Sequence, residues 1–329
     1  MFLPASYEAA LFLMLLSMFS WGSWANTLKL CPKFRFQLFY WDYAIGLMLG
    51  AVALGLTAGS FGHAGSPFLA AIRNATPGAI WWSICGGAVF NVANLLLVAA
   101  IDVAGLAVAF PIGIGLALVV GAVSSYFVNP AGNPILLFGG VALVALAIVM
   151  DAAAYRKREH GATATTARGI VLSLVAGVLM GSFYPLVAHA MIARPVSGPY
   201  AISFFFAIGV VISTVPANLL LMAKPLDGKP RVNGGDFWRA PLGWHVAGIL
   251  GGAIWCLGAL SNFVASDAHI IGPAVSYSIG QGATMVSALW GVFVWREFAG
   301  APRAAHALLV LMFVLFLAGL GVVALAPLY

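Results

Sequence analysis

The sequence predicts an all-α polytopic membrane protein with ten transmembrane helices, arranged as two inverted repeats of five helices each. Three observations predict it. The chain is 63% hydrophobic and 7% charged, far below the roughly 25% charged residues of a soluble domain. Its apolar stretches are each long enough to cross about 30 Å of hydrocarbon at 1.5 Å per residue. One passage of the chain also occurs twice.

The apolar stretches define the expected spans in order along the chain. The first contains no Lys or Arg before Lys29, so it is interpreted as a retained helix and not as a signal peptide. The spans are expected at 8–28, 38–58, 77–100, 104–127, 133–155, 168–191, 199–223, 243–265, 271–294 and 304–327.

The repeated passage divides the chain into two halves. Its first copy holds GGAVF, Asp102 and GLAVAFPIGIG within 86–115, and its second holds GGAIW, Asp267 and GPAVSYSIGQG within 251–282. We expect the two aspartates to cap helices or turns. Because each half has an odd number of spans, the halves should be inverted, which is typical of alternating-access transporters. The expected units are residues 1–155, a short basic cytoplasmic connection at 156–167, and 168–329.

The basic residues predict the orientation. Only Arg73 and Arg194 fall at even-numbered connections, and loops rich in Lys and Arg stay in the cytoplasm. We therefore expect a multi-pass protein of the cell membrane with both termini outside. Its net charge of +6 is expected to reflect contact with anionic lipid head groups, and no nucleic-acid partner is expected. The other basic residues are Lys29, Lys33, Arg35, Arg156, Lys157, Arg158, Arg168, Lys224, Lys229, Arg231, Arg239, Arg296 and Arg303.

Polar and aromatic side chains deep within the spans are candidates for a substrate-binding site, because an unpaired polar group is costly in hydrocarbon. Amides can read the donors and acceptors of a small ring, and indoles can stack on its faces. Helix bridging, packing and interfacial anchoring are the alternative roles for the same side chains, and the residues alone suit a nucleobase, a ureide or a sugar equally. The candidates are Trp24, Asn91, Asn94, Tyr184, Trp255, Asn262, Tyr277 and Gln281.

Coupling or gating requires charged groups that sense the substrate cavity. We expect Glu8 and Asp42 to be the first candidates for proton coupling, with Asp42 forming a salt bridge near Lys29 and Arg35 that closes the cytoplasmic side. Glu297 follows Arg296 and is expected to form a local ion pair. The six histidines and three cysteines are scattered without ligand spacing, so neither a metal, a cofactor nor a catalytic set is expected.

Several motifs resemble those of the ureide permeases. They are Trp21-Gly22-Ser23-Trp24 with the following basic residues and Trp41-Asp42-Tyr43, Gly86-Gly87 with Asn94, and Tyr277-Ser278-Ile279-Gly280-Gln281 with Ser287–Val292 and Glu297.

The resemblance implies the fold of the drug/metabolite transporter superfamily, which includes glucose/ribose and rhamnose porters. It also implies proton-linked uptake of allantoin, uracil or xanthine-like compounds. A monosaccharide transporter and, less favoured, a multidrug or metabolite exporter are the alternatives. The long central loop of the plant members, with its P-loop-like motif, has no counterpart here, so the resemblance lends ATP regulation no support. The oligomeric state is not predicted.

Overall fold

The computed structural model describes residues 1–158, 167–193, 197–226, 228–267 and 271–329. Within these residues, nine helices are long and apolar enough to cross a membrane. The chain is therefore an all-α polytopic membrane protein, as predicted. The long helices are α1 (Tyr7–Ser23) with its short continuation α2 (Asn26–Lys29), α3 (Phe36–Leu56), α5 (Pro77–Ala104), α6 (Leu106–Val128), α7 (Pro134–Arg158), α8 (Ala167–Ile192), α9 (Pro199–Ala223), α11 (Leu242–Asp267) and α14 (Arg303–Leu325).

The span expected at 271–294 is not one continuous helix. It consists of α12 (Pro273–Gly280), α13 (Ala283–Leu289) and a π-helical turn η1 (Trp290–Val294), joined end to end. Discontinuous helices of this kind line substrate sites in transporters, because they free backbone and side-chain groups at mid-membrane depth. The break therefore marks a place to examine for a site.

The junction between the third and fourth spans differs from the expectation. α5 continues to Ala104 and ends where Gly105 takes a φ of 78°, a left-handed conformation that favours glycine. Asp102 therefore lies in the last turn of α5, and Asp267 is the last residue of α11. The two aspartates thus occupy matching places at the ends of α5 and α11, and their role in capping helices or turns stays a prediction.

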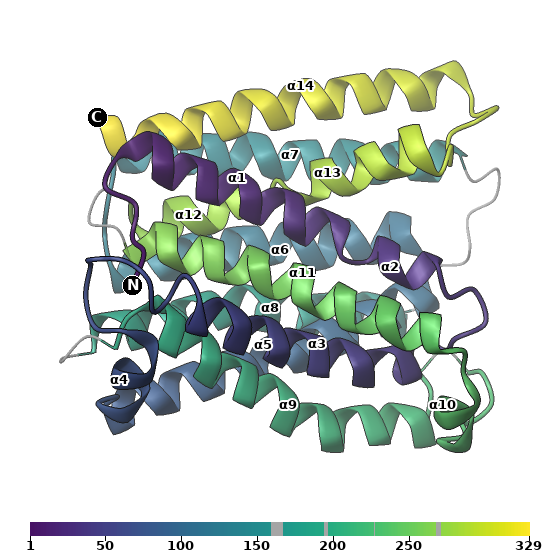
Figure 1. Ribbon diagram of the computed structural model, residues 1–329. Coiled ribbons are helices and arrows are strands. Elements are labelled where there is room, and N and C mark those ends of the chain that lie inside the picture. The colour runs from purple at the N-terminus through teal and green to yellow at the C-terminus, as the bar shows by residue number, and fades with distance from the viewer. Residues whose placement is uncertain (159–166, 194–196, 227, 268–270) are drawn as a thin grey trace.

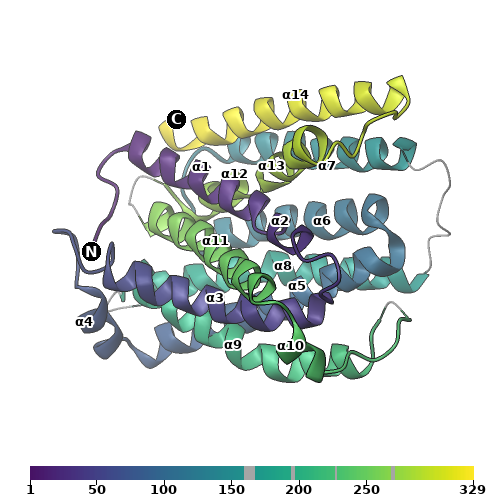
Figure 2. The same ribbon diagram turned by 45° about the vertical axis from the view of Figure 1, so that its right-hand side comes forward.

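The helices form one bundle with both chain termini at the same end (Figure 1). α7 and α14 lie side by side along one edge of the bundle, while α9 runs along the opposite edge (Figures 1 and 2). The short helix α4 (Phe68–Arg73) lies at the end that carries the termini, and α10 (Gly235–Arg239) lies at the other end. We call the first the terminal end and the second, where α2 and the end of α7 also lie, the basic end.

Two helix crossings in the centre depend on glycine. A Cβ added to Gly252 of α11 would lie 1.9 Å from the carbonyl oxygen of Tyr43 in α3, and one added to Gly46 would lie 2.0 Å from that of Ile249. Such close approach of backbones requires residues without side chains.

The same arrangement occurs where α5 crosses α9. A Cβ added to Gly87 would lie 2.0 Å from the carbonyl oxygen of Phe206, and one added to Gly209 would lie 2.2 Å from that of Ile84. Gly87 and Gly252 occupy equivalent places in the sequence repeat, as do Gly46 and Gly209. Equivalent glycines thus form the α3–α11 and the α5–α9 crossings, as expected if the two halves of the chain are related.

Candidate functional site

A stack of aromatic rings occupies the middle of the bundle. The ring of Trp255, in the middle of α11, stacks on Phe90 of α5 with a centroid distance of 4.0 Å. Phe206 of α9 lies 5.7 Å from Trp255 and Trp21 of α1 lies 5.8 Å from it, both in stacked geometry. Four helices from both halves of the chain thus meet at Trp255, which is 5% exposed.

Two polar atoms next to this stack are buried without a partner. Within the described residues, neither the indole nitrogen of Trp21 nor the hydroxyl of Tyr43 has a hydrogen-bond partner. Tyr43 lies 4.9 Å from the ring of Trp24, which places that predicted tryptophan in the same region. Buried polar atoms are almost always satisfied in folded proteins. These two are therefore exceptions that mark this region as a candidate for a binding site.

The break in the ninth span brings Gln281 into this region. Gly282 and Thr284 each donate their backbone N–H to the residue three positions earlier, so the chain tightens where α12 ends and α13 begins. A Cβ at the adjoining Gly280 would lie 2.7 Å from the Trp21 ring. The Gln281 side chain is 8% exposed and makes no hydrogen bond in the described part of the chain. Its amide is thus an unused donor and acceptor pair directly after the glycine that packs on Trp21.

Asn262 of α11 is committed to a hydrogen-bond network. Its side-chain oxygen accepts from Tyr184 at 2.5 Å and from Ser276 at 2.9 Å, and its amide nitrogen donates to Ser17 at 3.1 Å. Tyr277 lies against Tyr184, with ring centroids 4.9 Å apart, and donates to the carbonyl oxygen of Ala117. The predicted residues Tyr184, Asn262 and Tyr277 are therefore brought together, in contacts that join five spans.

Asn91 and Asn94 form a second network on the other side of the aromatic stack. The hydroxyl of Tyr40 donates to the side-chain oxygen of Asn91 at 2.9 Å and accepts from Asn94 at 3.1 Å. Asn91 also donates to Ser213 at 2.9 Å and accepts from Thr214 at 3.2 Å. Asn91 thus bridges α3, α5 and α9, which is the structural alternative that the sequence left open for it.

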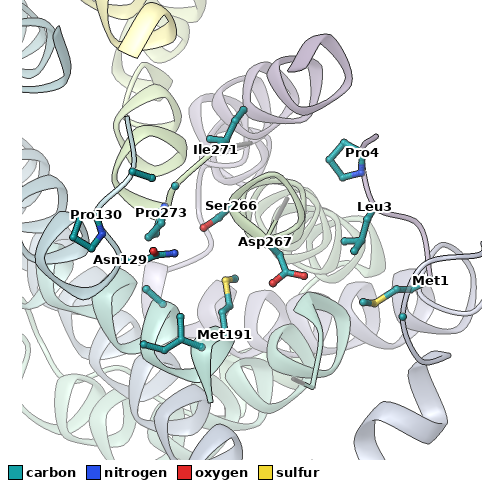
Figure 3. A pocket seen from close by; sticks show the side chains of 15 residues that line it. Met1, Leu3, Pro4, Asn129, Pro130, Met191, Ser266, Asp267, Ile271 and Pro273 are labelled. Carbon is teal, nitrogen blue, oxygen red and sulfur yellow. The ribbon is translucent and has the colours of Figure 1, made fainter. Parts of the chain in front are cut away.

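A cavity of about 660 Å³ opens at the terminal end (Figure 3). Ser266 and Met191 belong to its lining, and the hydroxyl of Ser266 is buried without a partner among the described residues. Ser266 lies one helical turn beyond Asn262 on the same face of α11. The lining of the cavity therefore comes within one helical turn of Asn262 on α11.

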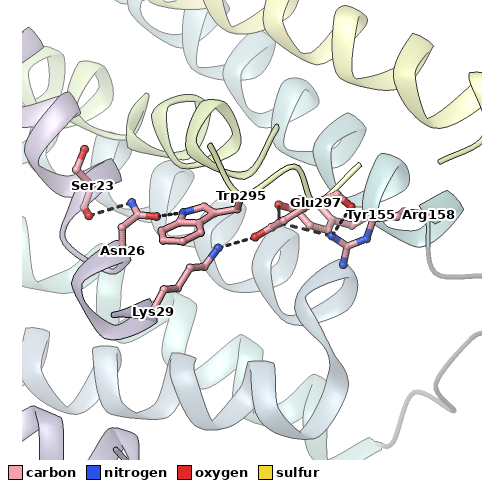
Figure 4. Close-up of polar contacts among 7 residues, drawn as sticks. All are labelled: Ser23, Asn26, Lys29, Tyr155, Arg158, Trp295 and Glu297. Atoms are coloured by element: carbon pink, nitrogen blue, oxygen red, sulfur yellow. Dashed lines mark hydrogen bonds and ion pairs between the residues drawn. The ribbon is translucent and has the colours of Figure 1, made fainter. Parts of the chain in front are cut away.

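The basic end is closed by contacts to Glu297 (Figure 4). Its carboxylate pairs with Lys29 of α2 at 2.5 Å and accepts from the hydroxyl of Tyr155 at 2.9 Å. Arg158 lies 3.5 Å from the same carboxylate. Partial burial tends to raise the pKa of Glu297, but the hydrogen bonds from Lys29 and Tyr155 and the positive charges nearby outweigh it, so the pKa lies below its usual value.

Aromatic contacts reinforce this closure. The ammonium group of Lys29 lies 4.8 Å from the centre of the Trp295 ring, and the Trp295 indole donates to Asn26 at 2.6 Å. Trp290 donates to Ser23 at 2.9 Å. The segment after the broken span is thereby fastened to the end of the first span.

The acidic residues differ in part from the expectation. Asp42 is joined to His245 of α11 at 2.8 Å, whereas Lys29 is joined to Glu297. The expected local pair of Glu297 with Arg296 is replaced by pairs from distant parts of the chain, and Arg296 has a left-handed φ of 52°. Glu8 lies exposed in the first turn of α1, at the terminal end, apart from the other three.

Comparison with known proteins identifies the family. The model of the family described as "Sugar transport protein" matches residues 12–326. The chain belongs to this sugar transport protein family. Its resemblance to the ureide permeases is confirmed: ureide permeases 1 and 2 of Arabidopsis thaliana are 22% and 23% identical to it, over 98% of this chain and 98% of theirs. Ureide permease 4 of the same plant is 24% identical over equal shares.

A solved crystal structure shares the fold of this sugar transport family member. One protein of known crystal structure superposes with a TM-score of 0.66 and 16% identity, over 96% of both chains. Because the family and its named relatives are transporters, the chain is a multi-pass membrane transporter of small metabolites. The alignment to ureide permease 1 spans 394 positions, against 329 residues here, so that relative carries additional residues.

Several residues of this region were not among the site residues predicted from the sequence. Tyr40 and Tyr43 of α3, Phe90 of α5 and His245 of α11 all contact predicted residues. Tyr40 and Tyr43 are three positions apart on one helical face, which is a signal that could have found them. Phe90 occupies the place of Trp255 in the sequence repeat, which is a second such signal. His245 carries none, because its partner lies on a distant span.

Proposed function

We propose that the protein imports a nucleobase or ureide by alternating access between two inverted halves, with the basic end in the cytoplasm. The observation that carries the proposal is the break at Gln281, which directly follows Gly280 where that glycine packs on the Trp21 ring, itself stacked on Trp255. An amide and an indole N–H supply donors and an acceptor for a planar, amide-rich ring, and the indoles supply faces for stacking. The ureide permease relatives support this substrate class.

The closed basic end and the cavity at the terminal end fit an outward-facing conformation of this cycle. Substrate would enter through the cavity near Ser266 and pass Asn262 to reach Trp255. Release would require the Glu297 contacts to Lys29 and Tyr155 to separate. The paired glycine crossings of the two halves support their exchange of shape.

Proton coupling is part of the proposal. Of the two residues predicted for it, Asp42 is 3% exposed and paired with His245, whereas Glu8 is exposed at the helix start. A carboxylate and an imidazole in contact form a unit whose protonation can change with conformation. Of the two, Asp42 is therefore the one in contact with a second titratable side chain, and it stays a candidate for the coupling role.

A monosaccharide is the second candidate substrate, because the family is described as a sugar transport family. Sugars also stack on indole rings and bond to amides. In that case Trp24 and Trp255 would serve as stacking platforms for the sugar ring.

A thermal-shift screen of the detergent-purified protein tests the substrate class. The panel sets allantoin, uracil, xanthine and hypoxanthine against glucose, ribose and rhamnose, since a ligand that binds only the folded state raises the melting temperature. Stabilisation by the heterocycles alone is the expected result, and stabilisation by sugars alone would replace the proposal by its alternative.

A pair of variants tests the place of the site. Gln281→Ala should remove the shift while leaving the melting temperature of the unliganded protein nearly unchanged, because the side chain makes no hydrogen bond in the described residues. Gln37→Ala is the matched control, since Gln37 is 9% exposed but lies near the basic end of α3. Normal binding by Gln281→Ala would show that the site lies elsewhere.

A further inference from the structure

One buried carboxyl group has no part in the contacts described so far. Asp151 of α7 is 4% exposed, and its Oδ1 atom has no hydrogen-bond partner among the described residues. It lies seven residues before Arg158, the last residue of the helix, which places it about 10 Å along the axis from the basic end. An ionised carboxylate at such a place needs a partner or water.

The groups around Asp151 belong mainly to the closure at the basic end. Tyr155 follows it by one helical turn and donates to the Glu297 carboxylate at 2.9 Å. Asp151 therefore lies one helical turn from the residue that holds the Glu297 carboxylate. Gly291 of η1 leaves room for this contact, because a Cβ there would lie 3.1 Å from the Glu297 carboxylate and 3.2 Å from the Tyr155 hydroxyl.

The other helices packed on α7 supply no charge that offsets Glu297 at this depth. α6 contains no Asp, Glu, Lys, Arg or His. α14 carries Arg303 and His306 at the basic end, and both are exposed. Arg158 lies against the Tyr155 ring, 4.7 Å from its centre, and is already within reach of Glu297.

We propose that Asp151 binds the proton that this transporter carries, while the Lys29–Glu297 closure is formed. A neutral Asp151 is compatible with the Glu297 carboxylate nearby, and an ionised one is repelled by it. Opening of the basic end separates the two groups, so that Asp151 gives its proton to cytoplasmic water and becomes a carboxylate. Conversely, closure favours uptake of a proton at Asp151, which links protonation to the state of the gate. The inference rests on the proposed function, because it names a residue for its proton coupling.

An infrared measurement on the detergent-purified protein tests the protonation without any transported substrate. At neutral pH the wild-type protein should show the carbonyl stretch of a protonated carboxyl group, and Asp151→Asn should abolish that band. Asp42→Asn and Asp236→Asn, the second on an exposed part of α10, should leave it in place. A band unchanged in Asp151→Asn, or absent from the wild-type protein, would overturn the proposal.

Transport by proteoliposomes tests the coupling. With labelled uracil or allantoin, Asp151→Asn should retain exchange across the membrane but lose accumulation driven by a pH gradient, whereas Asp236→Asn should behave as the wild-type protein does. Gradient-driven accumulation by Asp151→Asn, or loss of its exchange as well, would contradict the assignment. If Asp151→Asn does not fold, Asp151→Glu is measured instead, and a pH dependence of accumulation identical to the wild type would contradict it.

The two tests separate this inference from the proposed function. A wild-type protein that exchanges none of the heterocycles contradicts the proposed substrates, and the infrared band still decides whether Asp151 holds a proton. A protein that exchanges them but whose band is insensitive to Asp151→Asn keeps its substrates and loses this proton site.

Discussion

Lys29 and Glu297 lie 268 positions apart in the chain, and their side chains meet at 2.5 Å at the basic end of the bundle. Lys29 ends the first span, and Glu297 follows the broken ninth span. Through Tyr155 the same carboxylate is also tied to α7. One carboxylate therefore fastens three elements that would have to separate for this end to open.

Glu297→Gln should loosen the basic end. The Cys31 thiol, 2% exposed and close to the carbonyl oxygens of Thr27 and Trp244, should then react faster with a maleimide. A partly exposed ion pair contributes about 1 kcal/mol, which corresponds to a roughly fivefold change in the open population. The rate is measured by mass spectrometry in a background in which Cys85 and Cys256 are alanine.

The control variant removes an ion pair that lies at the same end but within one short helix, so that the pair joins no two spans. Asp236→Asn breaks only the exposed contact with Arg239 within α10 and should leave the Cys31 rate unchanged. Equal rates for Glu297→Gln and the unmodified protein would show that Glu297 does not hold this end closed.

The stability of the protein should depend on pH through Glu297. Its pKa is lower in the folded protein than the usual value of about 4.3. The stabilisation is therefore fully present above that usual value and is lost as the pH falls through the lowered pKa. The melting temperature, followed by tryptophan fluorescence, should fall less in Glu297→Gln than in the wild type between neutral pH and about pH 3. Identical falls would contradict the role of the carboxylate.

The glycine crossings should not tolerate a methyl group. Gly252→Ala would place a Cβ 1.9 Å from the carbonyl oxygen of Tyr43, and the helices would have to move apart. We expect a loss of about 1–3 kcal/mol, typical of overpacking, seen as a lower melting temperature. Gly139→Ala in α7 is the matched control, since nothing lies within 4 Å of its added Cβ. A melting temperature equal to that of the control would contradict the close crossing.

Asn262 and Gln281 should differ in what their loss changes. Asn262→Ala leaves the hydroxyl of Tyr184 without its 2.5 Å partner and should destabilise the protein by about 1–3 kcal/mol. Gln281→Ala removes no hydrogen bond among the described residues and should leave the stability nearly unchanged. The melting temperatures of the two variants are measured without ligand. Equal values would contradict the finding that Asn262 holds a hydrogen-bond network while the Gln281 amide is unbonded.

The spans could be predicted closely from the sequence because their lengths follow from the thickness of a bilayer. The first expected span, 8–28, corresponds to helical residues Tyr7–Lys29, and 199–223 agrees with α9 at both ends. The break at Gln281 was not predicted, although Gly280 and Gly282 flank it and glycine pairs are common helix breakers. A long run without charged residues masks such a break, because hydropathy counts residues and not hydrogen bonds.

The site could be predicted only as a set of separate residues. Depth and helical face indicated Asn91, Asn94 and Asn262, but the partners of Asn91 lie 51 and more positions away and cannot be read from local spacing. The same holds for Glu297, whose neighbour Arg296 suggested a local pair while its partners are Lys29 and Arg158. Contacts between distant spans are set by packing, which a single sequence does not specify. The division at 156–167 stays a prediction, and its residues 159–166 lie outside the described part of the chain.

Counterflow of labelled uracil and allantoin into proteoliposomes loaded with the unlabelled compound tests most directly whether Gln281 binds the transported ring. We expect counterflow by the wild-type protein and by Gln37→Ala, and none by Gln281→Ala, because the amide at the broken span binds that ring. Equal counterflow by Gln281→Ala, or counterflow of glucose and ribose in place of the heterocycles, would contradict it.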